Sequence, residues 1–443
     1  MKQPLERIVP ETRLPEETDV VIIGGGIAGC CTALSLSREG VRVTLLEKGL
    51  IGCEQSSRNW GWCRQQGRDP KELELAKLSL DMWPGLAMIL DRDPGFQRSG
   101  VTFLTDKEAE VAAWQDWQKL AAEKGIDSVL LSAEQARSAV LGGTSGKWIA
   151  GLSTPSDGRA EPSRTAPFVA QAAQRLGAKI LEGCAVHTVE TTNGRVSAVH
   201  TERGTIRCQS VVVAAGAWTS LFLRKLGVRF PQAYVHGSVC STLPIDANVE
   251  GCISTPYFSF RARQDGGLTV AKSGRGTVYV TPSLLRYAYQ FLPTYLLRRK
   301  KVKLRLTAQF WRELRQEYNY LKRNVSPFHD ERILDPSPDS GLVGEAVRDV
   351  ESMFPGLGKL TLGSAWGGVI DSTPDAVPVI SEIRALPGLV VASGFSGHGF
   401  GLGPGVGHVV ACLVQGRSAP IDMTPFRYDR MIDGSRLVPY IHF

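Results

Sequence analysis

Residues 19–29 read Asp19-Val20-Val21-Ile22-Ile23-Gly24-Gly25-Gly26-Ile27-Ala28-Gly29, and an alanine- and leucine-rich run follows as far as Arg38. A second apolar run, Val41 to Leu46, comes directly before Glu47. This order predicts a buried strand, a glycine turn, a helix and a second buried strand. Strand and helix in this alternation are typical of an α/β fold with a parallel sheet.

Gly24, Gly26 and Gly29 have the G-x-G-x-x-G spacing of dinucleotide-binding turns. Gly24 permits the tight turn, Gly26 leaves room for a pyrophosphate, and Gly29 lets the helix pack on the strand. The phosphates would lie at the positive end of the helix. Glu47 stands roughly 20 residues after the glycines, where a carboxylate binds a ribose hydroxyl. An ordinary glycine-rich turn is the alternative, but the complete pattern favours a dinucleotide site.

The composition is that of a soluble globular protein. The chain has 443 residues, of which 43% are hydrophobic and 21% charged, enough for about two or three domains' worth of core. Its net charge of +7 is local, because residues 281–330 contain 11 lysines and arginines and three acidic residues. So local an excess does not indicate a general nucleic-acid-binding role.

The cysteines and the N-terminus indicate a cytoplasmic protein. The nine cysteines include no C-x-x-C pair and no Cys/His spacing typical of zinc, so we expect a reducing compartment and no metal site. The acidic residues Glu6, Glu11, Glu16 and Glu17 precede any apolar run, which argues against a signal peptide. No apolar run approaches the roughly 20 residues of a membrane-spanning helix.

Further along the chain, three segments frame the predicted dinucleotide site. Residues 55–67 contain two tryptophans and two arginines without a period of 2 or 3.6, which indicates a functional loop rather than a packed connection. Val211 to Ala214 reads as a buried strand that returns to the first sheet and breaks at Gly216. The glycine-rich run Gly394 to Pro404 precedes a C-terminal helix that would start beside the cofactor.

Residues 283–324 are long, basic and aromatic, and their pattern predicts two helices broken at Pro293. We favour a pair of helices packed on a neighbouring domain with a solvated basic face. The alternative is a weak contact with an acidic membrane surface, because basic amphipathic helices with aromatic anchors bind anionic lipid.

The stretch Asp19 to Glu47, the run Ala214 to Trp218, the Thr373-Pro374-Asp375 loop with Pro378, and Gly394 to Pro404 together resemble the D-amino-acid oxidase and glycine oxidase family of flavoproteins. Their order and spacing are similar over nearly the whole chain. The Ser56 to Gly67 loop and the basic segment are more similar still to the bacterial L-amino-acid oxidases and deaminases of that family.

The resemblance implies an α/β (α+β) fold with two domains. A Rossmann-like FAD-binding domain would comprise residues 18–95, 150–234 and 335–443. A β-sheet substrate-binding domain would comprise residues 96–149 and 235–334, with residues 283–324 as a helical insertion. We also expect a homodimer that binds no nucleic acid.

The resemblance also implies FAD, which we expect to be noncovalent, because no cysteine between Ala365 and Pro378 matches the attachment site of some sarcosine oxidases. Twenty-three residues are expected around FAD: Gly24, Gly26, Ile27, Ala28, Gly29, Glu47, Lys48, Ser56, Ser57, Arg58, Asn59, Trp60, Gly61, Trp62, Val186, Ala215, Gly216, Trp218, Gly397, His398, Gly399, Phe400 and Gly401.

The implied activity is oxidation of an L-amino acid to a 2-oxo acid and ammonia. Hydride would pass from Cα to flavin N5, and molecular oxygen would be reduced to hydrogen peroxide. The alternative is a D-amino-acid or secondary-amine dehydrogenase that passes electrons to a quinone chain. A flavin-fold binding or tRNA-modifying protein is a rival of another class, which the compact Ser-Arg-Asn-Trp loop disfavours.

Candidate substrate residues follow from the chemistry. Arg261 and Arg263 lie two apart on a predicted strand, so both would face one side, and an arginine fork suits a carboxylate. Arg263 is slightly favoured, and Arg64 is the alternative. The resemblance to the deaminases implies that Trp366 forms the pocket wall, with Trp218 as a second candidate, and Gln66 could contact substrate from the flavin-side loop. His398, among glycines, is interpreted as part of the flavin environment.

Overall fold

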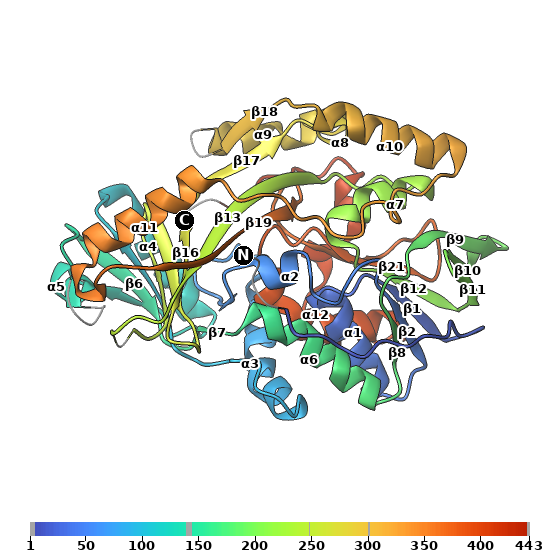
Figure 1. Cartoon of the computed structure of the whole chain (residues 1–443), viewed down its shortest axis with the longest axis horizontal. Helices are drawn as coiled ribbons and strands as arrows, with labels where there is room; N and C mark the ends of the chain where they lie inside the picture. Colours follow the sequence, from blue (N-terminus) through green and yellow to red (C-terminus); the bar gives the residue numbers. More distant parts are fainter. Residues whose placement is uncertain (1–4, 139–143, 248, 300–301, 441–443) are drawn as a thin grey trace.

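The computed structural model describes residues 5–138, 144–247, 249–299 and 302–440. Two large sheets lie side by side (Figure 1), one of six strands and one of ten. The predicted α/β (α+β) fold is confirmed, with a largely parallel six-stranded sheet that contains the first strands of the chain and a largely antiparallel second sheet.

The six-stranded sheet has β1 (Val20–Ile23) at its centre, between β2 (Val43–Leu46) and β12 (Ser210–Val213), and these three strands run parallel. The full order is β20-β21-β12-β1-β2-β8. The outer strands are β20 (Val379–Glu382), β21 (Leu389–Ser393) and β8 (Lys179–Leu181). The predicted return of the apolar strand after residue 210 to this sheet is therefore confirmed.

Both faces of this sheet are covered, as its continuous apolar strands require. Val20 and Ile22 of β1 belong to the core beneath the helices, whereas Val21 and Ile23 belong to a core on the opposite face. The helices are α1 (Ile27–Arg38), α3 (Leu73–Ile89), α6 (Pro162–Arg175) and α12 (Gly399–Val414). The opposite face holds β9 (Val186–Thr192), β10 (Arg195–Thr201), β11 (Gly204–Arg207) and α7 (Thr219–Lys225).

The ten-stranded sheet has the order β18-β17-β13-β16-β15-β14-β4-β6-β5, with β19 paired to β13. Its strands are β4 (Val101–Thr105), β5 (Val129–Leu131), β6 (Ala150–Thr154), β13 (Ala233–Thr242), β14 (Cys252–Ser254), β15 (Phe258–Ala262), β16 (Leu268–Lys272), β17 (Gly276–Tyr279), β18 (Val302–Arg305) and β19 (Leu362–Ser372). Its helices are α4 (Glu108–Glu123), α5 (Ala133–Ser138) and α11 (Ser340–Met353).

Two strands belong to a different sheet from the one that the predicted domain borders imply. β6 and β19 belong to the ten-stranded sheet, although the expected borders place residues 150–234 and 335–443 in the FAD-binding domain. β19 pairs with β13 from Ser372, opposite Ala233, to Leu362, opposite Thr242. The domain division itself stays a prediction, but a division by sheets would transfer both strands.

The insertion differs from the predicted pair of helices. It contains α8 (Pro282–Arg286), α9 (Ala288–Arg298), β18 and α10 (Gln309–Arg323), which extend above β17 in Figure 1. Pro293 lies within α9, so the predicted break there is wrong. β18 pairs in parallel with β17, and residues 300–301 lie outside the described part. Among the described residues, no helix has both the length and the apolar character needed to cross a bilayer.

Candidate active site

The glycine turn between β1 and α1 leaves no room for side chains. A Cβ atom on Gly24, whose φ is +109°, would lie 2.4 Å from the carbonyl oxygen of Ala214. A Cβ atom on Gly29 would lie 2.0 Å from the carbonyl oxygen of Gly24. The hydroxyl of Ser56 accepts a hydrogen bond from the backbone nitrogen of Ile27 at 2.8 Å. The backbone therefore has the close approaches predicted for Gly24 and Gly29.

Glu47 lies beside this turn. Its carboxylate accepts hydrogen bonds from the backbone nitrogens of Gly25 and Gly49, both at 2.7 Å. Burial raises the pKa of Glu47 to about 7, an effect that Lys48 partly opposes. The Nζ atom of Lys48 lies 3.0 Å from Glu54 and 4.5 Å from the ring centroid of Trp218. These groups form one end of a binding surface.

A cavity of about 110 Å³, the turn cavity, opens at this end. Nine residues expected around FAD line it: Gly24, Gly26, Glu47, Lys48, Ser56, Val186, Ala215, Gly216 and Trp218. Trp218 therefore lies among the residues that are expected to bind the dinucleotide. Its predicted role in a substrate wall is not supported by this position.

A larger cavity of about 810 Å³, the main cavity, begins at the same turn and extends between the two sheets. Thirteen of the expected FAD residues line it: Gly26, Ile27, Ala28, Ser56, Arg58, Asn59, Trp60, Trp62, Gly216, Gly397, His398, Gly399 and Phe400. Gly29, Ser57, Gly61 and Gly401 line neither of these two cavities. Gly61 instead lies against the carbonyl oxygen of Ala160, 2.5 Å from where its Cβ would be.

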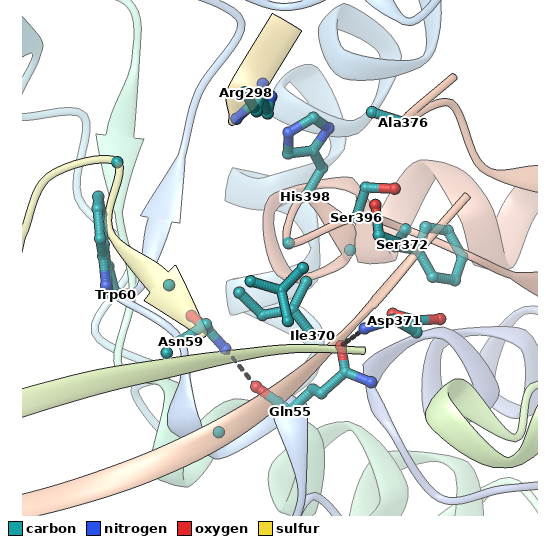
Figure 2. Close-up of a pocket in the computed structure, with 18 of the residues that line it drawn as sticks. Gln55, Asn59, Trp60, Arg298, Ile370, Asp371, Ser372, Ala376, Ser396 and His398 are labelled. Carbon is teal, nitrogen blue, oxygen red and sulfur yellow. Dashed lines mark hydrogen bonds between the residues drawn. The ribbon is translucent and has the colours of Figure 1, made fainter. Parts of the chain in front are cut away.

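Helix α2 (Gln55–Arg58) and the loop after it are hydrogen-bonded to β19 of the ten-stranded sheet. The side-chain nitrogen of Asn59 donates to the carbonyl oxygen of Gln55 at 3.1 Å, and the side-chain oxygen of Gln55 accepts from the backbone nitrogen of Asp371 at 3.3 Å (Figure 2). The indole of Trp366 donates to the carbonyl oxygen of Arg58 at 3.1 Å. The loop is thus a fixed part of the main cavity's wall.

The structure corrects the prediction that Arg261 or Arg263 holds the substrate carboxylate. The guanidinium of Arg261, which is 1% exposed, lies 2.8 Å and 3.2 Å from the two carboxylate oxygens of Glu161. Arg263 lies beyond the end of β15 and pairs with Asp265 at 2.9 Å. Neither arginine lines the main cavity. Because both side chains already pair with carboxylates, neither is available to a substrate.

Arg64, the alternative named from the sequence, does line the main cavity. Its guanidinium lies 5.5 Å from the ring centroid of Phe103 and 5.7 Å from that of Trp62, and it donates to the carbonyl oxygen of Gln66. Burial and the neighbouring Arg68 lower the pKa of Arg64 to about 9. Arg68 also lines the cavity, and its Nη1 atom is buried without a hydrogen-bond partner among the described residues. Arg68 was not predicted from the sequence, although it follows Arg64 by four residues.

His398 lines the main cavity, and a buried carboxylate fixes its imidazole ring. Its Nδ1 atom lies 2.9 Å from a carboxylate oxygen of Glu72, a residue that is fully buried. Burial lowers the pKa of His398 to about 4, so the imidazole is neutral near pH 7. With the proton on Nδ1, the Nε2 atom is the hydrogen-bond acceptor. The sequence indicated His398 but not Glu72, which is 326 positions away.

The predicted wall residues are replaced by other aromatic side chains. Trp366 is 5% exposed and packs in a cluster with Val239, Ala271 and Trp60, and of these four residues Val239 and Trp60 line the cavity. Gln66 is fully buried and accepts a hydrogen bond from Thr154 at 2.7 Å. Neither residue lines the main cavity, which corrects both predictions. The observed aromatic lining includes Trp60, Trp62, Phe103 and Trp114.

Comparison with known proteins agrees with this geometry. Residues 19–413 match the family described as FAD dependent oxidoreductase (DAO). The chain is 25% identical over 419 residues to mitochondrial sarcosine dehydrogenase of Mus musculus, a match that covers 92% of this chain and 41% of that protein. It is 23% identical to glycine oxidase of Pseudomonas putida over 92% of this chain and 97% of that protein. The chain thus spans less than half the length of the sarcosine dehydrogenase.

Solved structures give a similar result. L-amino acid deaminase from Proteus myxofaciens, in complex with anthranilate, is 28% identical and superimposes with a TM-score of 0.91, over 97% of this chain and 96% of that chain. L-amino acid deaminase from Proteus vulgaris is 26% identical with a TM-score of 0.89, over 95% and 99%.

Proposed function

Because the chain belongs to the DAO family of FAD dependent oxidoreductases, we propose that it is an FAD-dependent L-amino-acid oxidase. The amino acid, oxygen and water would be converted to a 2-oxo acid, ammonia and hydrogen peroxide. One observation carries this proposal. A single main cavity joins the glycine turn, at Gly26 and Ala28, to an arginine and aromatic wall at Arg64 and Trp62.

The residues of the site fit FAD. The close approaches at Gly24 and Gly29 exclude side chains from the turn, so its backbone is accessible to a pyrophosphate. Glu47 lies where a carboxylate is expected to bind a ribose hydroxyl. A volume of about 810 Å³ is within the usual range of cofactor pockets. Bound FAD supplies the redox chemistry, and the protein supplies binding and orientation. We propose that the cofactor is noncovalent.

The chain's own side chains would hold and orient the substrate. The guanidinium of Arg64 offers a planar fork to the substrate carboxylate. The aromatic side chains around it, Trp62, Phe103 and Trp114, exclude water and strengthen that pairing. His398, neutral and held by Glu72, presents Nε2 as an acceptor for the substrate amine.

Two sets of relatives favour two substrates. Similarity to the Proteus L-amino acid deaminases over nearly the whole chain supports an L-amino acid. The second candidate is a secondary-amine or D-amino-acid dehydrogenase whose electrons would pass to a quinone chain. Similarity to sarcosine dehydrogenase supports its secondary-amine form.

The deciding experiment compares L-amino acids, D-amino acids and sarcosine with the purified yellow protein. We expect equal amounts of 2-oxo acid and peroxide from L-amino acids alone. Turnover of sarcosine or D-amino acids with an artificial quinone, without peroxide, would favour the second candidate. A protein that binds no FAD would contradict both.

We also propose a weak contact between the insertion and an anionic membrane surface. Tyr289, Leu306 and Trp311 of the insertion are 89%, 71% and 68% exposed. They lie on the segment that carries the chain's local basic excess. Exposed aromatic and apolar side chains with nearby cations suit a lipid surface of negative charge.

A further inference from the structure

The insertion is part of the wall of the main cavity. It contributes ten lining residues from α8, α9 and β18, among them Phe291, Tyr295, Arg298 and Leu304. Helix α9 is anchored beside the cavity by Thr294, whose hydroxyl donates to the carbonyl oxygen of Pro374. The main cavity therefore extends from the glycine turn to the insertion, which the sequence predicted only as helices packed on a neighbouring domain.

Arg298, the last residue of α9, is the cation that the insertion brings to this wall. It is among the residues drawn in Figure 2, together with His398, around the same pocket. Among the described residues, the guanidinium of Arg298 has no hydrogen-bond or ion-pair partner. Two other cations of the lining are paired: Arg58 lies 2.7 Å from Asp335, and Lys272 contacts Asp349 and lies 3.6 Å from Glu345.

The acids that line the cavity are engaged elsewhere. Asp69 accepts from the backbone nitrogen of Lys71 at 2.9 Å, Glu110 from the hydroxyl of Thr105 at 2.7 Å, and Asp371 from the backbone nitrogen of Gly394 at 2.8 Å. Burial lowers the pKa of the Arg298 guanidinium. A partly buried cation without an acidic neighbour is unfavourable, and an anion of the ligand relieves this cost.

We propose that Arg298 binds a carboxylate of the substrate, so that the insertion completes the substrate site. This rests on the proposed amino-acid oxidation. Arg64 and Arg298 come from segments far apart in the sequence and line the same cavity. The carboxylate at Arg298 belongs either to the side chain of an acidic amino acid or to the α-carbon of any amino acid.

The test measures binding without turnover. The FAD-loaded enzyme is titrated with acetate and with glutarate, and the flavin absorbance spectrum reports binding. The variants are Arg298→Gln, Arg298→Lys and the matched control Arg299→Gln, which removes the neighbouring exposed arginine. We expect Arg298→Gln to weaken binding about 10- to 100-fold, Arg298→Lys to weaken it less, and Arg299→Gln to leave it unchanged.

Acetate and glutarate distinguish a side-chain carboxylate of the substrate from its α-carboxylate. Weaker binding of glutarate alone would assign Arg298 to an acidic side chain, and an equal effect on acetate would assign it to the α-carboxylate. Unchanged binding of both, no binding by the unaltered enzyme, or loss of flavin from both Arg298 variants would overturn the proposal. Because no amino acid is oxidised in this assay, a failure of the proposed function does not decide its outcome.

Discussion

Glu72 and His398 precede different helices, α3 and α12, and are joined by a hydrogen bond of 2.9 Å between a carboxylate oxygen and Nδ1. Glu72 is fully buried, whereas His398 lines the main cavity. The carboxylate thus fixes both the ring orientation and the nitrogen that faces the ligand. Glu72 is a positioning residue that acts through His398.

We predict that Glu72→Gln lowers kcat/KM about tenfold while FAD stays bound. The amide nitrogen can donate to Nδ1, which permits the other tautomer of His398 and removes the acceptor at Nε2. The measurement is kcat/KM against pH, together with flavin content. Glu74→Gln is the control, because Glu74 begins the same helix but is exposed. Equal pH profiles for both variants would show that Glu72 has only a structural role.

A second prediction concerns Arg64. Arg64→Gln should weaken the binding of amino acids by about 2–5 kcal/mol, because a desolvated charge pair is lost. Amines without a carboxylate should bind as before. The measurement is the apparent affinity for both classes of ligand, with Arg263→Gln as the control. Equal weakening of amines and amino acids would contradict the assignment of Arg64 to the carboxylate.

Arg261 should affect stability rather than substrate recognition. Arg261→Leu removes the two-bond partner of the buried Glu161 and leaves it only Arg159 at 3.7 Å, which is expected to cost about 3–5 kcal/mol of unfolding free energy. Thermal unfolding of the variant checks this, and replacing Glu161 as well should recover part of the loss. A stable Arg261→Leu protein with weakened amino-acid binding would restore the expectation drawn from the sequence.

Glu47 predicts a pH dependence of the FAD-free protein. Its raised pKa, about 7 from an ordinary 4.5, means that the folded state holds its proton where the unfolded chain has lost it. The stability from this proton is complete below about pH 4.5 and is lost as pH rises through 7. In Glu47→Gln the neutral amide does not titrate, so this stability does not fall as the pH rises. Urea unfolding should therefore show that the free energy of unfolding of the variant, relative to the unaltered protein, increases by roughly 1–3 kcal/mol between about pH 4.5 and about pH 7. A constant difference would contradict the shift.

For the insertion, we predict salt-sensitive sedimentation with anionic vesicles. Trp311→Ser should reduce it, because an exposed aromatic anchor is lost. Met88→Ser is the control, since Met88 is 84% exposed but lies on α3. Peroxide formed in the supernatant would be in keeping with an oxidase that needs no membrane. Sedimentation that is independent of salt and of Trp311 would contradict the proposed contact.

The parts of the fold that follow local rules could be predicted from the sequence. The glycine turn, its strands and the helix after it depend on residues within 29 positions, from Asp19 to Glu47, and each has a distinct local signature. The strand β18 was missed although Val302-Lys303-Leu304-Arg305 alternates apolar and basic residues, because the aromatic, basic segment around it reads as helical.

The candidate site was less predictable because pairing is a tertiary property. Arg261 and Arg263 have the right chemistry, but only the structure brings Glu161, 100 positions away, onto Arg261. Trp366 lies on β19, the strand that contributes residues 368–372 to the cavity, but its own side chain packs in a buried cluster with Val239 and Ala271. The position of a residue on a strand indicates on which face of the sheet its side chain lies. Whether a ligand can reach that side chain depends on which other residues pack over the same face.

The parallel pairing of β18 with β17 has a consequence for the protein's solubility. β18 is the outermost strand at one end of the ten-stranded sheet, where unpaired backbone groups can recruit the edge of another molecule. Lys303 and Arg305 are exposed along it. Positive side chains on an edge strand repel a second copy, so part of the local basic excess protects against edge-to-edge aggregation. Trimming the insertion would transfer that exposure to β17, a strand without a single lysine or arginine.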